Sequence, residues 1–308
     1  MSKRAVVFGS SGQLGVELMR ELRSRGYEAH GFERKAVDIT DRELVEQRLA
    51  GLDPGVVFNA AAYNQVDVAE KEPQAAYLAN ALGVRSLALA CRQVDARLVH
   101  FSTDYVFDGS GDRPWREDDA PRPLSAYGAS KLAGENEIRA AGGAFLIVRS
   151  SWVYSATGKN FLRTISGLAR ERKELRIVAD QIGAPTSAAL IGDVVTGMLA
   201  GGCDALRERC KRSGGVVHMA ASGEVSWHGF ASAIVEGLKA RGLKLAIEQV
   251  VPISTDQYPT KAQRPRNSRL NLTRLQSVFD ITPPSWQDAL SPELNHLARE
   301  FGSAQSGG

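Results

Sequence analysis

Features that mark several protein classes are absent or scarce in this sequence. Only three cysteines occur among 308 residues, an odd number without the close spacing of a metal site, which fits a reducing cytoplasm. The five histidines are scattered, and their spacing offers no metal-binding quartet. No apolar stretch approaches the roughly 18 uninterrupted residues of a membrane span. These absences predict a cytoplasmic protein with no bound metal and no membrane partner.

Charge of one sign is not in excess either. The formal net charge is +3, the signs are interspersed, and no run of basic residues forms a patch, which argues against a nucleic-acid partner. Glycine-rich sequence begins at residue 9, too early for a signal peptide. With 43% hydrophobic and 24% charged residues, the chain has an ordinary globular composition, and its length suits one large domain or two modest ones.

The first half of the sequence alternates short apolar runs with amphipathic stretches. After the first run, leucines recur every four residues at Leu14, Leu18 and Leu22, which predicts a helix. Gly26 resembles the end of that helix. Thr40 and Glu43 resemble a capping box, and Pro73 suits the start of a long helix. This alternation predicts a Rossmann-like, doubly wound α/β fold with a parallel sheet. The runs predict strands at 5–8, 28–32, 55–62, 97–103 and 145–151.

A glycine loop follows the first predicted strand and opens the first predicted helix. Gly9, Gly12 and Gly15 form a G-x-x-G-x-x-G pattern. Glycine permits the tight turn and the close approach of a pyrophosphate, whose charge the free N–H groups of the helix start would bind. A tight strand-to-helix turn without a ligand is the alternative. The position of the loop favours dinucleotide binding.

The residues after the second predicted strand bear on the choice of nicotinamide. Glu33 lies where an acidic side chain would bind a ribose 2′-hydroxyl, whereas Arg34 and Lys35 would accept a 2′-phosphate. We favour NADPH and leave NADH open. The predicted cofactor-binding residues are Gly9, Ser11, Gly12, Gln13, Leu14, Arg34, Asp38, Ile39, Ala60, Ala61, Ala62, Tyr63, Tyr127 and Lys131.

The rhythm of strands and helices loosens after about residue 150. We interpret residues 1–150 as an NAD(P)-binding Rossmann domain and 151–301 as a smaller, interleaved substrate lobe, with part of 175–200 returning to the first domain. The tail, 302–308, is rich in glycine and serine and is predicted to be disordered. Further strands are predicted at 175–179, 216–220 and 246–253, and further helices at 160–172, 187–200, 226–241 and 286–300.

Three polar residues form a candidate catalytic set. Thr103 ends the fourth predicted strand, where ligands bind in open α/β sheets. Tyr127 and Lys131, four positions apart, share one helical face. An ammonium beside the phenol, with an oxidised nicotinamide nearby, is expected to lower the pKa of Tyr127 toward neutrality. Tyr127 would protonate a carbonyl oxygen that Thr103 also binds, and Lys131 would hold the nicotinamide ribose.

Motifs along nearly the whole chain resemble those of the dTDP-4-dehydrorhamnose reductases, a group of extended short-chain dehydrogenases. They run in order as GSSGQLG, NAAAYNQVDVAE, STDYVFDG, YGASK, SSWVY, DQIGAPT and RPRNSRLN. The resemblance implies NAD(P)H-dependent reduction of the C4 ketone of dTDP-4-dehydro-L-rhamnose to dTDP-L-rhamnose. A reductase of another dTDP-4-keto-6-deoxysugar and a non-catalytic NADP-binding regulatory subunit are the alternatives, and the catalytic set argues against the second.

The resemblance also assigns substrate residues. It implies that Asp104 and Trp152 contact the hexose, although Trp152 would equally suit a hydrophobic core. Arg264, Arg266 and Arg269 offer cations to the nucleotide diphosphate, and we select Arg264 and Arg269.

One family feature is not matched. Some relatives join subunits through magnesium held by glutamates, and Glu17 matches one such position. Ala189 stands where another acidic residue is needed, and the last predicted helix offers His296 in place of a carboxylate. We therefore expect no metal, and either a monomer or a homodimer.

Overall fold

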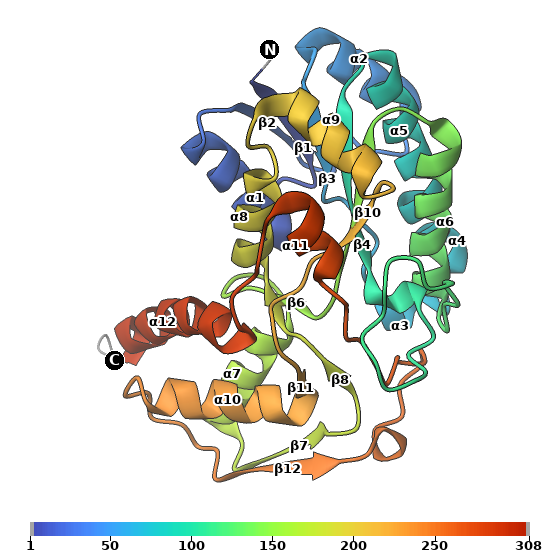
Figure 1. Ribbon diagram of the computed structural model, residues 1–308. Helices are drawn as coiled ribbons and strands as arrows, with labels where there is room; N and C mark the ends of the chain where they lie inside the picture. Colours follow the sequence, from blue (N-terminus) through green and yellow to red (C-terminus); the bar gives the residue numbers. More distant parts are fainter. Residues whose placement is uncertain (1–2, 306–308) are drawn as a thin grey trace.

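A six-stranded parallel sheet forms the centre of the structure, a computed structural model that describes residues 3–305 (Figure 1). The strand order is β10-β5-β4-β3-β1-β2, and every neighbouring pair is parallel. The side chains of β1 and β3 to β5 are almost all buried, as expected for strands covered on both faces. The doubly wound fold is therefore confirmed. The strands are β1 (Arg4–Phe8), β2 (Glu28–Phe32), β3 (Val56–Asn59), β4 (Arg97–Thr103), β5 (Phe145–Ser150) and β10 (Val216–His218).

Helices cover both faces of this sheet. One face packs against α1 (Gln13–Ser24), α8 (Ala188–Gly197), α9 (Gly202–Arg212) and α11 (Thr273–Phe279). The other packs against α2 (Arg42–Leu52), α5 (Gly83–Gln93) and α6 (Ala126–Ala141). In Figure 1, α1 and α8 lie on the opposite side of the sheet from α5 and α6. The segment from α8 to β10 thus packs with the sheet, although it lies late in the sequence.

A second hydrophobic cluster lies beyond the carboxyl ends of the strands (lower part of Figure 1). It is built by α7 (Phe161–Glu171), α10 (Trp227–Lys239) and α12 (Trp286–Gln305). The parallel pair β7 (Glu174–Val178) and β12 (Gln249–Ile253) lies beside α10. Two of the helices that cover the sheet, α9 and α11, were not anticipated, since their apolar positions are few and widely spaced.

Short elements connect the two clusters. They comprise β6 (Val153–Tyr154) paired with β9 (Thr186–Ser187), β8 (Ile182–Gly183) paired with β11 (Val225–Ser226), the single turn α3 (Val66–Ala69), and the 3₁₀ turns η2 (Asp104–Val106) and η3 (Thr255–Gln257).

Three sequence-based expectations differ from the structure. The N-cap of α2 is Asp41, whose side chain accepts from the Leu44 N–H, so the predicted Thr40 capping box is wrong. The long helix that Pro73 opens runs without a gap to Gln93, but it is not α-helical throughout: α4 (Pro73–Tyr77) passes through a π-helical turn, η1 (Leu78–Leu82), into α5. Helix α12 continues to Gln305, so the predicted disorder does not hold for 302–305, and 306–308 lie outside the described residues.

Candidate functional site at the carboxyl edge of the sheet

The strand order reverses at β1, whose two neighbours are β2 and β3. In open α/β sheets such a reversal leaves a crevice at the carboxyl ends of the strands, where ligands bind. The predicted glycine loop lies there. Gly9 has a φ of 76°, and a Cβ added to it would lie 2.6 Å from the Ala61 nitrogen and 2.7 Å from the Ala60 carbonyl carbon. Only glycine therefore fits between the loop and the end of β3.

The rest of the loop has the form that a pyrophosphate needs. A Cβ on Gly15 would overlap the Gly9 carbonyl oxygen, so the start of α1 packs directly on the loop. Gly12 is the N-cap of α1, and no side chain caps the helix there. A Cβ on Gly12 would meet only the Gly9 oxygen, at 3.3 Å, and Ser11 beside it is exposed. Free helix N–H groups beside open space fit a bound phosphate group.

Gln13 at the start of α1 joins the loop to the second cluster. Its amide donates to the Lys159 carbonyl at 3.0 Å, and it accepts from Asn160 at 3.2 Å. Leu14, the next residue, packs against the first core cluster. The Gln13 side chain is thus hydrogen-bonded within the chain.

The residues after β2 form a small charged turn. Arg34 is largely exposed, and its Nε donates to Asp38 at 3.1 Å. Asp38 also accepts from the backbone and hydroxyl of Thr40. Burial raises the pKa of Asp38, but the hydrogen bonds from Thr40 and Arg34 outweigh burial and lower it. Ile39 is buried, and its side chain fills the space beside Gly83 of α5.

The alanines after β3 line the same crevice. Ala60 and Ala61 are half-buried under Gly9, and Ala62 is exposed. The Tyr63 backbone N–H donates to Asn80 at 2.9 Å, and the Asn80 amide donates back to the Tyr63 carbonyl. Asn80, buried in the π-helical turn η1, therefore fixes the segment that follows β3, a role that the sequence analysis did not assign.

The predicted catalytic residues meet at the ends of β4 and α6. Thr103 is the last residue of β4, and its side chain lies close enough to Tyr127 to lower the pKa of the phenol. Ser125 caps α6 by accepting from the Gly128 N–H at 3.1 Å. A Cβ on Gly128 would overlap the Tyr105 carbonyl oxygen, so glycine lets α6 begin close to the turn that follows β4. This close approach brings Tyr127 to Thr103.

The charge state of Tyr127 differs from the expectation. Burial, followed by the carboxylate of Asp104 and the phenol of Tyr105, raises its pKa, although the nearby Thr103 side chain lowers it. The expected lowering by Lys131 is absent, because the Lys131 amine is turned toward β4. It donates to the Phe101 carbonyl at 2.6 Å. In the chain without cofactor, Tyr127 is therefore a protonated phenol.

Asp104 is buried beside this set. Only 2% of the residue is exposed, and one carboxylate oxygen accepts from the Thr103 hydroxyl at 3.0 Å while the other is buried without a hydrogen-bond partner. Burial raises the pKa of Asp104 to about 6, although the nearby hydroxyls of Ser268 and Thr103 lower it. A buried acceptor without a partner next to Tyr127 suits the hydroxyl of a ligand.

Trp152 follows β5 with a φ of 50°, a backbone conformation that costs a tryptophan about 1–3 kcal/mol. Its ring stacks on Trp227, with the centroids 3.6 Å apart and the planes 11° apart. A Cβ on Gly183 would lie 2.6 Å from the Trp152 ring. The ring is therefore packed between β8 and α10, but it stays half-buried and belongs to no buried core cluster, so Trp152 is not a core residue.

The predicted diphosphate arginines are already paired. Arg264 donates to the Asp67 carboxylate at 2.5 Å and to the Tyr105 hydroxyl at 3.2 Å. Arg269 is paired with Glu224 at 3.1 Å. Arg266 is exposed. Tyr105 in turn packs edge-on against Tyr127, with the ring centroids 5.6 Å apart. Among these arginines, Arg264 is therefore linked to Tyr127 through Tyr105.

A layer of buried polar residues was missed by the sequence analysis. On the sheet face beneath α6, the Glu135 carboxylate binds Arg149 at 2.6 Å and accepts from Ser102 at 2.6 Å. Asn59 and His100 lie on the same face, where Asn59 contacts His100 and His100 contacts Lys131. All five are buried. The sequence did contain a signal for this layer, because each of these apolar strand runs includes a polar side chain. A polar side chain that is buried with its strand needs a hydrogen-bonding or charged partner.

The structure also corrects the account of the magnesium position. Helix α12 does offer a carboxylate near Glu17, namely that of Glu293. Burial raises the pKa of Glu293, and the negative charge of Glu17 raises it further. Glu293 accepts from the Ala156 N–H at 2.5 Å, and Glu17 is ion-paired with Arg20 at 2.7 Å. Within residues 3–305 no three His, Cys, Asp or Glu side chains form a group that could hold a metal. The expectation that no metal is bound stays a prediction.

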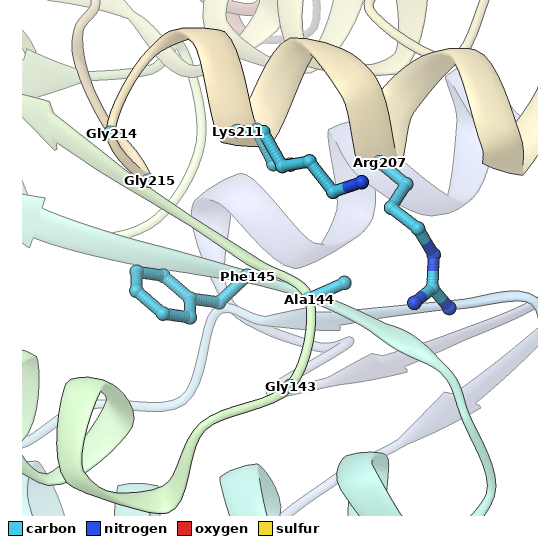
Figure 2. A pocket seen from close by; sticks show the side chains of 8 residues that line it. Gly143, Ala144, Phe145, Arg207, Lys211, Gly214 and Gly215 are labelled. Atoms are coloured by element: carbon cyan, nitrogen blue, oxygen red, sulfur yellow. The ribbon is translucent and has the colours of Figure 1, made fainter.

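A separate hollow of about 240 Å³ lies at the opposite edge of the sheet, at the amino ends of β5 and β10 (Figure 2). Figure 2 shows Arg207 and Lys211 of α9 beside the Gly143–Phe145 segment. Arg207 is paired with Asp95 at 2.5 Å and Lys211 with Glu208 at 2.8 Å. This hollow shares no residue with the carboxyl-edge site.

Comparison with known proteins gives the family. Residues 3–299 match the RmlD substrate binding domain. The chain belongs to the RmlD substrate binding domain family. A dTDP-4-dehydrorhamnose reductase of Burkholderia thailandensis is 44% identical over 291 residues, 93% of this chain and 96% of that protein. The dTDP-4-dehydrorhamnose reductase of Escherichia coli strain K12 is 39% identical over 298 residues, which cover 95% of this chain and 97% of that protein. The resemblance to dTDP-4-dehydrorhamnose reductases is confirmed.

Solved structures agree with this family. The dTDP-4-dehydrorhamnose reductase of Clostridium acetobutylicum has a TM-score of 0.86 at 34% identity, covering 96% of this chain and 99% of that one. The one of Bacillus anthracis, solved in complex with NADP, has a TM-score of 0.84 at 35% identity, covering 97% and 100%. A UDP-glucose 4-epimerase of Thermus thermophilus, 20% identical, shares the fold alone, with a TM-score of 0.76.

Within residues 3–305, no single helix is long and apolar enough to cross a membrane. Helices α8 and α9 reach that length and apolar character only when taken together, and the pair is bent by 104°.

Proposed function

We propose that this chain uses NADPH to reduce the C4 ketone of dTDP-4-dehydro-L-rhamnose, giving dTDP-L-rhamnose. The observation that carries the proposal is the meeting of Thr103 and Tyr127 at the carboxyl edge of the sheet, with Lys131 on the same helix face and a glycine loop at the crevice. Relatives with 39–44% identity along nearly the whole chain are dTDP-4-dehydrorhamnose reductases, which supports this substrate.

The glycine loop and the start of α1 would hold the pyrophosphate of the cofactor, which when bound supplies the hydride. Arg34 is exposed and its guanidinium binds only one carboxylate oxygen, so it has donors left for a 2′-phosphate. The NADP in the Bacillus anthracis relative supports the same choice. NADH is the alternative cofactor.

Tyr127 is proposed as the proton donor to the ketone oxygen. Its raised pKa keeps the phenol protonated at neutral pH, which reduction requires at the start of each turnover. Thr103 lies beside the phenol and would hydrogen-bond the same substrate oxygen. Lys131 is proposed to hold the ribose of the cofactor and to stabilise the phenolate that Tyr127 becomes.

Substrate contacts are proposed for four further residues. The buried, unpartnered oxygen of Asp104 would accept from a hexose hydroxyl, and the Trp152 ring edge would border the sugar. Arg264 and Arg269 would exchange their carboxylate partners for diphosphate oxygens. We propose a cytoplasmic monomer or homodimer in which residues 1–150 hold the cofactor and 151–301 the substrate.

The test measures oxidation of NADPH and NADH by the purified chain with enzymatically prepared dTDP-4-dehydro-L-rhamnose. The proposal predicts turnover with this sugar and a higher kcat/KM with NADPH. Turnover only with a different dTDP-4-keto-6-deoxysugar would replace the proposed substrate. Cofactor binding without turnover of any ketosugar would support a regulatory subunit instead.

A further inference from the structure

A buried chain of hydrogen bonds leads from the cofactor crevice to Lys131. The Ala61 N–H donates to the Asn59 side-chain oxygen at 3.1 Å, and the Asn59 amide nitrogen lies 3.0 Å from His100 Nδ1. His100 Nε2 lies 3.3 Å from Lys131 Nζ, which donates to the Phe101 carbonyl at 2.6 Å. Asn59, His100 and Lys131 are at most 2% exposed.

One end of this chain fixes the direction of every hydrogen bond in it. A backbone N–H can only donate, so the Asn59 oxygen must face Ala61 and the Asn59 NH₂ must face His100. His100 Nδ1 therefore accepts. A neutral imidazole carries one hydrogen, which then lies on Nε2 and points at Lys131 Nζ.

Lys131 Nζ thus meets a donor from His100 and an acceptor from Phe101. An ammonium has three donors and no lone pair, so it would face the His100 N–H donor to donor. A neutral amine has one lone pair for His100 and two hydrogens, one of which binds the Phe101 carbonyl. The arrangement therefore matches the neutral amine of Lys131.

We propose that Asn59 and His100 are positioning residues that hold the Lys131 amine and stabilise its neutral form, through a His100 tautomer that Asn59 fixes. The proposal rests on the function proposed above, in which Lys131 serves the reacting Tyr127. It assigns no contact between His100 and the substrate.

The electrostatics of the site agree with this geometry. Burial, the larger cause, holds the pKa of His100 well below its usual value, and Lys131 lowers it further whenever it is charged, so the imidazole is neutral in either state of Lys131. Burial lowers the pKa of Lys131 to about 8, although Glu135 on the same helix raises it. The other titratable group facing Lys131 is His100 from β4. Asn59 on β3 carries no charge.

A readily deprotonated Lys131 has a use in the reaction. After Tyr127 gives its proton to the ketone oxygen, the phenolate oxygen must gain a new O–H bond. An ammonium N–H bond of Lys131 can break to supply that proton, directly or through an intervening hydroxyl, and the resulting amine accepts the His100 hydrogen bond. Lys131 then regains a proton from water, so the balance of protons closes.

The direct test reads the His100 tautomer by nitrogen-15 NMR of histidine-labelled protein without cofactor or substrate. His100→Gln identifies the signal, with single variants of the other four histidines as a second route to the assignment. The proposal predicts neutral imidazole with hydrogen on Nε2 at neutral pH. Hydrogen on Nδ1, or an imidazolium, overturns it. This reading needs no turnover, so its failure is distinct from failure of the proposed reaction.

A variant that reverses the hydrogen bonds provides the second test. In Asn59→Asp, a carboxylate faces both Ala61 and His100, so Nδ1 must carry the hydrogen and Nε2 becomes an acceptor for the Lys131 ammonium. We expect the hydrogen to move to Nδ1, and the ionisation of Lys131 in the pH profile of kcat/KM to rise by about one pH unit, the effect of one hydrogen bond.

Two further variants keep the second test decisive if Asn59→Asp does not fold. His100→Gln can turn its carbonyl to the ammonium and should give the same alkaline shift. His218→Gln is the matched control, because His218 is a buried histidine on β10, two strands from β4, and its Nδ1 contacts the Trp115 carbonyl. It should leave the Lys131 ionisation in place. An unshifted profile in His100→Gln, or an equal shift in His218→Gln, contradicts the proposal.

Discussion

Replacing Asp104 by asparagine separates what the folded chain tolerates from what the proposed reaction needs. Asp104 is 2% exposed, and one of its carboxylate oxygens has no hydrogen-bond partner. Asn has nearly the same shape and carries no charge at any pH. We therefore expect Asp104→Asn to raise the free energy of unfolding at pH 7, and to lower turnover because the hexose loses a charged acceptor.

The magnitude follows from the pKa of Asp104. Burial raises it from 3.8 to about 6, so the folded state holds this proton more tightly than the unfolded state. The favourable effect of the raised pKa is present below pH 3.8 and is lost as the pH rises through 6. Relative to a neutral side chain, the ionised Asp104 therefore costs the folded state about 3 kcal/mol at pH 7, and roughly half of that at pH 5.

The assay is urea unfolding of both proteins at pH 7 and pH 5, followed by circular dichroism. The free energy of unfolding of Asp104→Asn should exceed that of the unchanged chain by about 3 kcal/mol at pH 7, and this difference should shrink at pH 5. An equal difference at both pH values, or a destabilised variant at pH 7, refutes the reasoning, since it would show that Asp104 is not ionised at a cost in the folded state.

Further predictions concern the loop, the arginine and the metal. Gly9→Ala should weaken NADPH binding roughly tenfold or more, measured by fluorescence titration, because of its left-handed φ and the contact with Ala61; Gly51→Ala, in open space on α2, is the matched control and should bind normally. Arg264→Gln should raise KM for the nucleotide sugar more than it changes kcat; an unchanged KM would remove Arg264 from the substrate site. Chelator treatment should leave the elution volume in size-exclusion chromatography unchanged, because Glu17 and Glu293 are already engaged; dissociation would show that a metal joins subunits.

The inner strands of the sheet were predictable because they are buried on both faces. Each appears in the sequence as a continuous apolar run between helical patterns, and β4 ends at the residue predicted. The edge strand β2 has no buried residue, and it also ends at the residue predicted. The errors arose where polar residues compete for one role. Thr40 and Asp41 are adjacent capping candidates, and Asp41 is the cap because Thr40 is held by Asp38. Such a choice depends on contacts that sequence spacing does not contain.

The candidate site was predictable in its residues more than in its electrostatics. The spacing of Tyr127 and Lys131 fixes a shared helical face, and Thr103 lies at a strand end. The pKa of Tyr127 depends on burial and on the direction in which Lys131 turns, which is set by carbonyl and imidazole partners on β4. His100 was passed over as one scattered histidine, because its partners are remote in sequence.

Turnover by Tyr127→Phe tests the central claim most directly. The change removes only the phenolic hydroxyl that lies beside Thr103 and that is proposed to protonate the ketone. We predict a kcat lower by about a hundredfold or more, with the Kd for NADPH close to that of the unchanged chain. A kcat near that of the unchanged chain would contradict the assignment of Tyr127 as the proton donor.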